Sequence, residues 1–441
     1  MRRFSAVSFS SAWVCARVRL RVGEQSADTV AQRSETLKMS WITTALLCGL
    51  FAAATLVQTR LPVGNLSANN LAAPLFAVSL AWRERGTAVV ALRRHRRLLT
   101  ATALLYGWVW LSALNGVLPV LSLRIAAKYG GYVVVFGCLL VLLQQRATWH
   151  RAQRTVHAVL VAFGILGAIE YWFPVFPFWQ VRGQLILYPR VASLLLWPNQ
   201  FGVLMAIGVV FGGALRHEGR LPTWADNATQ PVFLLALVLS GSRNGWCTFA
   251  ALLAVSTVVR VISVRRAAVL GLGFFLLLLT FPVPTAQLGL RGVPGLPLSK
   301  FAAGIAPPDL SHTNTPAQTL TSRLTLWRAA IAEIEQHPLS GLGPEGFATT
   351  IGPRITGQVG INTHDLPLHL ATDLGLVGLV LAAVWLAVLL RAGDLRRGTA
   401  SLPLLGLGLG QIVDCFTYDY TFIVFGLIFA ACYASVPREA G

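Results

Sequence analysis

Long apolar runs separated by short clusters of charged residues dominate the chain from residue 41 onward. A helix needs about 20 residues to cross a hydrocarbon core of about 30 Å, and somewhat fewer when flanking Arg and Trp side chains extend to the interface. By this criterion the pattern predicts twelve membrane-spanning helices, of which 69–82 is short. They are expected near 41–58, 69–82, 98–114, 127–144, 155–173, 201–215, 228–241, 243–259, 267–285, 366–390, 400–414 and 420–436. One long, kinked helix over 228–259 is an alternative to two spans there.

The spans divide the chain into five regions. The first is a leader at 1–40, where Arg17, Arg19 and Arg21 interrupt any apolar run. We interpret this leader as dispensable, because Met39 directly precedes the first span and is an alternative start; a signal peptide is the other reading. The remaining regions are nine spans over 41–285, a long loop at 286–365, three spans over 366–436 and a tail at 437–441.

The composition agrees with this organisation. Of 441 residues, 55% are hydrophobic and 12% charged, against about 25% charged in a soluble chain. Disorder, a coiled coil and most soluble folds are therefore excluded, and the expected fold is an all-α polytopic membrane protein whose long outer loop contains short helices.

The net charge of +19 is explained by topology rather than by a nucleic-acid partner. With the N-terminus inside, 25 of the 36 basic residues fall on one side of the predicted membrane and 11 on the other. Lys and Arg favour the cytoplasmic side of short loops, so both termini are predicted to be cytoplasmic and 286–365 extracytoplasmic.

Several motifs for other chemistries are absent. The sequence contains no CxxC, HExxH, P-loop or GxSxG motif and no Asp-x-Asp pair, so no metal, cofactor or cytoplasmic nucleotide chemistry is expected. The run Gly406, Gly408 and Gly410 lies in a span and predicts close helix packing rather than a phosphate loop.

The long loop is too extended to be a simple connector. A helix is predicted to begin at Thr321-Ser322-Arg323, where either hydroxyl can cap it, and to stop at Pro338. Its apolar face is expected to consist of Trp327, Ala330, Ile331 and Ile334. Residues 341–347 are predicted to form a tight turn that lies on this helix.

The end of the loop places His364 directly before a span that Asp365 is expected to cap. A helix N-terminus disfavours imidazolium, so His364 is suited to act as a general base; a surface histidine that solvates the helix end is the alternative. His369 and Asp373 are four residues apart and are predicted to pair inside the bundle.

Two arginines lie at the mouths of predicted spans. Arg190 precedes Pro198-Asn199, and Arg243 follows Ser242 between two apolar runs. Arginine near hydrocarbon is costly and usually has an anionic partner, and guanidinium groups bind phosphate oxygens in a bidentate manner. These side chains are therefore candidate diphosphate ligands, with interfacial anchoring as the alternative.

Taken in order, these segments resemble the O-antigen ligase/polymerase family of bacterial membrane glycosyltransferases. The resemblance covers roughly 185–390, and Asp365 stands where the family pattern has asparagine. The segments that carry it are Arg190 with Pro198-Asn199, Ser242-Arg243, Arg323 to Trp327, His337-Pro338-Leu339-Ser340-Gly341-Leu342-Gly343 to Phe347, His364-Asp365-Leu366-Pro367-Leu368 and Gly375-Leu376-Val377-Gly378.

The resemblance implies a metal-independent transfer of a glycan from a polyprenyl-diphosphate donor to a lipid, glycan or protein acceptor at the outer face of the bacterial inner membrane. His364 would be the catalytic base, while Arg190, Arg243 and Arg323 would bind the diphosphate. Asp365, His369 and Asn199 would support them. The alternatives are a transporter or flippase of lipid-linked or anionic solutes and a non-catalytic membrane scaffold. Ligase, polymerase and protein glycosylase are not separated.

Overall fold

The computed structural model describes residues 74–75, 77–79, 81–82, 85–172, 191–195, 197–281, 316–357, 360–395, 397–412, 414–415 and 420–436. The predicted leader, the span at 41–58 and the first part of the long loop lie outside these residues. Of the predicted span at 69–82, only short helical pieces are described. Every regular element among the described residues is a helix.

Ten of the predicted spans correspond to observed helices. These are α4 (Arg96–Leu114), α5 (Pro119–Leu142), α6 (Arg146–Trp172), α8 (Pro198–His217), α9 (Thr223–Leu239), α10 (Arg243–Val258), α11 (Val264–Thr280), α15 (Leu366–Ala392), α16 (Gly398–Ile412) and α17 (Tyr420–Ala434). The other described elements are α3 (Arg85–Arg94), α13 (Pro316–Gln336), a π-helical turn (Phe347–Ile351) and α14 (Gly352–Thr356).

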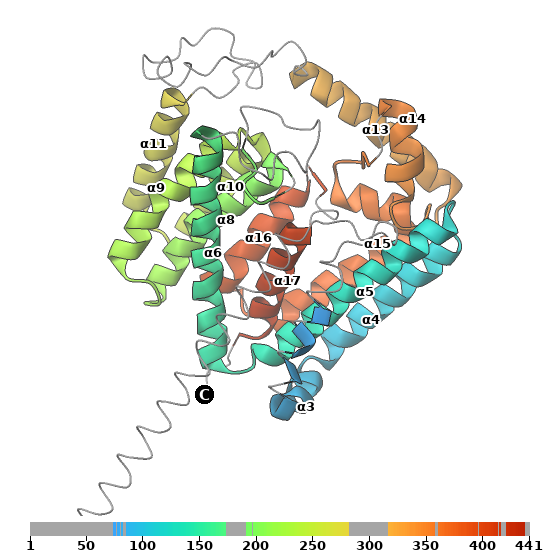
Figure 1. The fold of residues 1–441 in the computed structure, drawn as a ribbon, viewed down its shortest axis with the longest axis horizontal. Coiled ribbons are helices and arrows are strands. Elements are labelled where there is room, and N and C mark those ends of the chain that lie inside the picture. The colour runs from blue at the N-terminus through green and yellow to red at the C-terminus, as the bar shows by residue number, and fades with distance from the viewer. Residues whose placement is uncertain are drawn as a thin grey trace, which may run out of the picture.

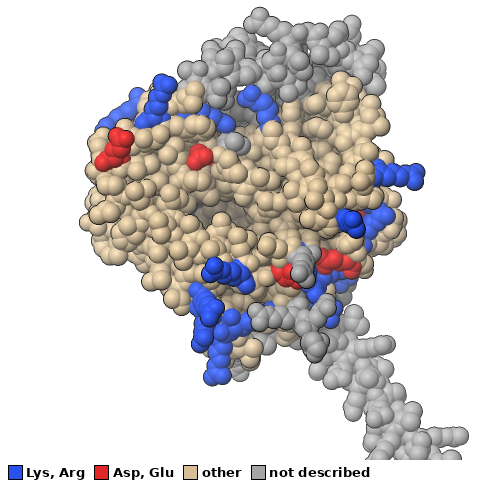
Figure 2. Space-filling view, turned by 180° about the vertical axis from the view of Figure 1, so that it is seen from behind, with Lys and Arg blue, Asp and Glu red and all other residues tan. Residues whose placement is uncertain are grey.

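Among the described residues, five helices are long and apolar enough to cross a membrane: α4, α5, α6, α8 and α15. The shorter stretch Phe422–Ala434 in α17 is also apolar. The chain is therefore a multi-pass membrane protein, and the number twelve stays a prediction. Figure 2 shows a broad face without charged side chains, with basic and acidic groups gathered toward its edges.

The helices form two groups joined by a central pair (Figure 1). Helices α6, α8, α9, α10 and α11 lie on one side, and α4, α5 and α15 lie on the other. Between them, α16 packs against α8 and α10, while α17 packs against α5 and contacts α15. Almost every residue of α8 is buried, as expected of a helix that is apolar all round and surrounded by others.

Small residues allow the helices around α8 to approach closely. A Cβ atom on Gly245 of α10 would lie 2.7 Å from the backbone of Gly202 in α8. The predicted packing role of the glycine run in α16 is confirmed at two positions: a Cβ would lie 2.6 Å from Ile207 at Gly406 and 2.9 Å from Val203 at Gly410. Gly408 has open space around it.

Residues 228–259 form two helices, so the single kinked helix is wrong. Helix α9 ends at Leu239 and α10 begins at Arg243. Ser242 caps α10, because its hydroxyl accepts a 3.0 Å hydrogen bond from the Gly245 amide. This cap fixes Arg243 at the first position of α10.

Helix α15 is broken, which the sequence pattern did not predict. Gly375 has φ 70° and ψ 179°, a conformation that is essentially restricted to glycine. The segment around the turn at 341–347 fills the break: the Leu342 amide donates to the Thr372 carbonyl at 2.8 Å and the Leu376 amide to Pro338 at 2.8 Å. These bonds satisfy backbone groups that the break exposes, which makes an irregular helix acceptable at membrane depth.

Candidate active site

His364 lies at the point where the long loop enters α15. Its backbone has φ 53°, a left-handed conformation that costs a non-glycine residue about 1–3 kcal/mol unless the surroundings enforce it. Here the His364 amide donates to Asn362 Oδ1 at 2.9 Å, and Asp365 caps α15 by accepting from the Leu368 amide at 2.8 Å. The predicted cap is therefore present, and local bonds on both sides hold His364.

The His364 ring is paired with a carboxylate that the sequence interpretation missed. His364 Nδ1 lies 3.0 Å from Asp414 Oδ1. Asp414 follows the end of α16, and its side chain is 4% exposed against 27% for His364. Asp414 is an acidic residue at the outer end of an apolar span in a chain with 17 acidic residues, and that rarity is the signal that could have found it.

Asp414 is held by three hydrogen bonds. Besides His364, Asn199 Nδ2 donates to Oδ2 at 2.7 Å and the Cys415 amide donates to Oδ1 at 2.9 Å. Asn199 is in the first turn of α8, so the carboxylate joins the start of α8 to the end of α16 and to the segment before α15. A buried carboxylate with this many donors is a rigid support for the histidine.

The charges and hydrogen bonds around Asp414 determine whether its carboxyl group is ionised. Burial raises the pKa of its carboxyl, but the hydrogen bond and charge of His364, the hydrogen bond from Asn199 and the charge of Arg323 hold this pKa below its ordinary value. Asp414 is therefore ionised at neutral pH and accepts a proton from Nδ1 of His364. In the neutral ring the lone pair is then on Nε2, to which no described residue donates.

The structure gives the His364 ring a partner that the sequence did not predict. The sequence predicted only the nearby helix N-terminus. The structure adds a carboxylate 3.0 Å from Nδ1. Asp414 therefore orients the ring and stabilises it once it has accepted a proton, which is what a general base requires.

Arg323 reaches the same site from α13. The helix begins at Pro316 rather than at Thr321, so the predicted caps at Thr321 and Ser322 lie inside it; proline is well tolerated in a first helical turn, which explains the earlier start. One turn after Arg323, Trp327 Nε1 donates to the Thr363 carbonyl at 2.8 Å. This bond fixes α13 beside His364, and the charge of Arg323 helps to lower the pKa of Asp414.

The buried face of α13 is partly the one that was expected. Ala330 is fully buried, whereas Ile331 is 51% exposed and Leu326 takes the buried position. Leu326 and Ala330 form a cluster with Leu342 and Phe347, so the predicted turn at 341–347 does pack on α13. Figure 1 shows α13 and α14 together beside the start of α15.

The remaining predicted diphosphate ligands differ in how the structure places them. Arg190 lies outside the described residues. Arg243 is exposed at the start of α10 and forms no ion pair with a described acid. Its neighbour Asn244 donates to the Gly410 carbonyl at 2.7 Å, near the end of α16 that leads to Asp414. No described contact joins Arg243 directly to His364.

His369 supports the site indirectly. Its Nε2 lies 3.6 Å from Asp373 Oδ2, and both side chains are 5% exposed, so the predicted internal pair is present. The Asp373 carboxylate also accepts from the amides of Glu345 at 2.7 Å and Phe347 at 3.0 Å. The pair therefore anchors the 341–347 turn against α15, and His369 lies one turn beyond the Asp365 cap.

Part of the chain is similar to a known protein family. Residues 232–383 match the family model described as O-antigen ligase. This match supports an assignment to the O-antigen ligase/polymerase family. A comparison with curated proteins found no match.

The matched segment contains Arg243, Arg323 and His364, whereas Asn199 and Asp414 lie outside it. The family is associated with glycosyl transfer of the ligase or polymerase type, and this association does not favour the transporter alternative. The carboxylate that contacts His364 thus comes from the segment after α16, beyond the matched residues, so the site is assembled from both parts of the chain.

Proposed function

We propose that this protein transfers a glycan from a polyprenyl-diphosphate donor to an acceptor hydroxyl at the outer face of the bacterial inner membrane, in the manner of an O-antigen ligase or polymerase. The observation that carries the proposal is the His364–Asp414 pair, a base with an ionised, buried orienting group. It lies beside Arg323 at one end of the helical bundle, on the side that the basic-residue distribution predicts to be extracytoplasmic.

In the proposed reaction, His364 Nε2 removes the proton from the acceptor hydroxyl as its oxygen attacks the anomeric carbon of the donor. A new carbon–oxygen bond forms while the bond from that carbon to the diphosphate breaks, and the electron pair moves to the departing diphosphate oxygen. Asp414 stabilises the imidazolium that results. A single displacement of this kind inverts the configuration at the anomeric carbon.

The arginines would act on the leaving group. A polyprenyl diphosphate carries its charge at the membrane surface, and guanidinium groups bind such oxygens with charge-assisted bonds. Arg323 is placed beside Asp414, and Arg243 is exposed at the start of α10. Together with Arg190 they would hold the diphosphate and stabilise the charge that develops on it. The acceptor is a lipid, a glycan or a protein.

The test compares two histidines of the same loop in purified full-length protein reconstituted in vesicles with a lipid-linked glycan donor and an acceptor panel. His364→Ala is expected to lower the transfer rate by about 10²–10⁴-fold, the usual contribution of a general base. His337→Ala is the matched control, because His337 is exposed just after α13 and should retain activity.

Three outcomes would refute the proposal. Near-normal transfer by His364→Ala would show that His364 is not the general base. Retention of configuration at the anomeric carbon of the product would exclude a single-displacement mechanism. Movement of donor across vesicles without any covalent product would favour the flippase alternative. In cells, loss of chain extension in a deletion strain would indicate a polymerase, whereas complete chains left on the carrier would indicate a ligase.

A further inference from the structure

A large basic pocket lies at the opposite end of the bundle from His364. Its volume is about 1030 Å³, at the upper end of the range of about 300–1000 Å³ typical of small-molecule sites. The start of α6, the connection from α8 to α9 and the connection from α15 to α16 provide its polar lining. The ends of α8, α15 and α16 that meet here are opposite the ends at which Asn199, His364 and Asp414 lie, so the pocket is separate from the candidate active site.

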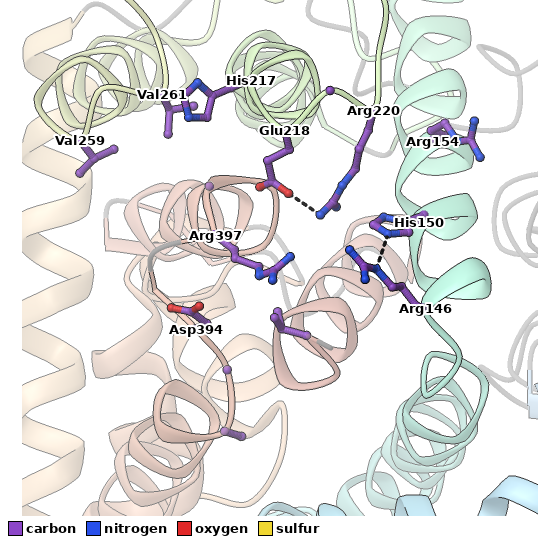
Figure 3. Close-up of a pocket in the computed structure, with 15 residues that line it drawn as sticks. Arg146, His150, Arg154, His217, Glu218, Arg220, Val259, Val261, Asp394 and Arg397 are labelled. Atoms are coloured by element: carbon purple, nitrogen blue, oxygen red, sulfur yellow. Dashed lines mark hydrogen bonds and ion pairs between the residues drawn. The ribbon is translucent and has the colours of Figure 1, made fainter. Parts of the chain in front are cut away.

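Arginine dominates the pocket. Four arginines line it, together with two histidines and only two acids. Figure 3 shows the guanidinium ends of Arg146, Arg220 and Arg397 directed toward the same space, with Glu218 beside Arg220 and Asp394 farther away. Positive-inside topology explains why basic residues occur on this side. It does not explain why arginines from three separate segments converge on one cavity.

The acid nearest to the arginines is already engaged. Glu218 forms an ion pair with Arg220, and its Oε1 accepts bonds from the Thr399 amide at 3.1 Å and the Thr399 hydroxyl at 2.7 Å. Arg220 also lies 4.4 Å from the centre of the Trp149 ring and donates to Gln153. Arg220 and Glu218 therefore form part of the pocket's rigid wall.

The charges around Arg220 show that the pocket is electropositive. Burial lowers the pKa of the Arg220 guanidinium, the charge of Glu218 raises it, and the like charges of Arg397 and Arg146 lower it. Like charges repel one another, and an anion bound among them would reduce this repulsion. Arg146 and Arg397 line the same cavity, and the resulting positive potential suits an anionic ligand.

His150 also lines the pocket, next to Arg146. Arg146 Nε donates to His150 Nε2 at 3.3 Å, so the proton of the neutral ring is on Nδ1. This Nδ1 atom is buried and has no hydrogen-bond partner among the described residues. A buried donor without an acceptor is costly, so this part of the pocket wall contains an unsatisfied polar group.

We propose that this pocket binds a phosphate-bearing anion, a class that includes the headgroup of an anionic lipid and a soluble diphosphate. Arginine forks match phosphate oxygens, and the pocket is too large for a single small ion. Val259, Val261, Ala392 and Val436 also line it, and these apolar side chains suit the glycerol or alkyl portion of such a molecule. Basic pockets between membrane helices on the cytoplasmic side are known to suit lipid headgroups. The proposal does not depend on the glycosyl-transfer proposal.

The experiment uses the full-length protein in phosphatidylcholine nanodiscs and measures its thermal midpoint by intrinsic fluorescence. In one arm part of the phosphatidylcholine is replaced by phosphatidylglycerol, and in the other inorganic pyrophosphate is added. A ligand that binds the folded state raises the midpoint with its concentration. The pocket variant is Arg146→Gln/Arg397→Gln. The control is Arg151→Gln/Arg265→Gln, which removes the same charge on the same side without changing a lining residue.

The wild type and the control are expected to gain stability in at least one arm, and the pocket variant to bind that probe about tenfold or more weakly. A gain with phosphatidylglycerol alone identifies a lipid headgroup, and a gain with pyrophosphate identifies a soluble anion. If the control and the pocket variant lose binding of the probe equally, the proposal is overturned, because general surface charge then explains the binding. No gain by the wild type in either arm also overturns it. If the double variant does not accumulate, Arg146→Gln alone replaces it.

Discussion

Asp414→Asn is the sharpest test of the way in which the candidate site is built. The substitution preserves the shape of the side chain but removes its charge and one acceptor oxygen. In the native protein the two oxygens accept bonds from His364 Nδ1 at 3.0 Å, Asn199 Nδ2 at 2.7 Å and the Cys415 amide at 2.9 Å. The substituted amide has one oxygen, so it can accept a hydrogen bond from either His364 or Asn199 but not from both, unless the Asn199 amide flips.

The expected effect follows from the role of the charge. The Asp414 carboxylate stabilises the imidazolium that forms as His364 accepts the proton, and a hydrogen bond to a charged group contributes about 1.5–3 kcal/mol. At about 1.4 kcal/mol per tenfold change in rate, the loss corresponds to a decrease in kcat of about 10- to 150-fold. If the amide nitrogen faces Nδ1, the ring carries its proton on Nε2 instead, and the decrease approaches that of His364→Ala.

The assay is transfer in reconstituted vesicles, with kcat and KM for the donor measured separately. Glu335→Gln is the matched control, since it makes the same chemical change at an exposed position of α13. The reasoning predicts a lower kcat with little change in KM for Asp414→Asn, and neither change for the control. If Asp414→Asn retains full kcat while His364→Ala is inactive, Asp414 does not assist the base. If only KM rises, Asp414 acts on donor binding instead.

The pH dependence of stability follows from the same residue. The pKa of Asp414 in the folded protein is below its ordinary value of 3.8. Its contribution to stability is therefore complete above the ordinary value and is lost as the pH falls through the folded value. The difference in thermal midpoint between the wild type and Asp414→Asn should be largest near neutral pH and should diminish in strong acid. A difference that grows on acidification would contradict an ionised Asp414.

Three further substitutions test other parts of the structure. Gly375→Ala should prevent accumulation of folded protein, because its Cβ would lie 2.0 Å from the Leu339 carbonyl oxygen. The control Gly408→Ala should accumulate normally, because Gly408 has open space around it. Equal accumulation of the two variants would argue against the break in α15. Asp365→Ala should lower the free energy of unfolding by about 0.5–2 kcal/mol while Asp365→Asn retains the cap, as thermal midpoints can show. Arg323→Gln should raise KM for the donor by about tenfold or more. Arg323→Lys should raise KM less, because it keeps the positive charge. An unchanged KM would show that Arg323 does not bind the diphosphate.

The helices themselves were largely predictable. Apolar runs of membrane length located ten of the described helices, and their ends fall within a few residues of the predicted bounds in most cases. The largest difference, at the start of α6, arises because the helix continues through the polar residues from Arg146 that precede its apolar part. Local chemistry was equally informative at Asp365, where a capping residue before an apolar run needs no knowledge of the rest of the chain.

The sequence by itself thus determined the membrane class, the run of helices and the location of His364, because these depend on hydrophobicity, run length and neighbouring residues. Only the tertiary structure decided which carboxylate orients the histidine. Asp414 is 50 residues from His364, and nothing in the spacing of two residues at the ends of different helices shows that they meet. The break at Gly375 depends in the same way on a turn from another part of the loop that fits into it. The basic pocket is also a tertiary feature, since its arginines come from connections far apart in the chain and converge only when the helices pack.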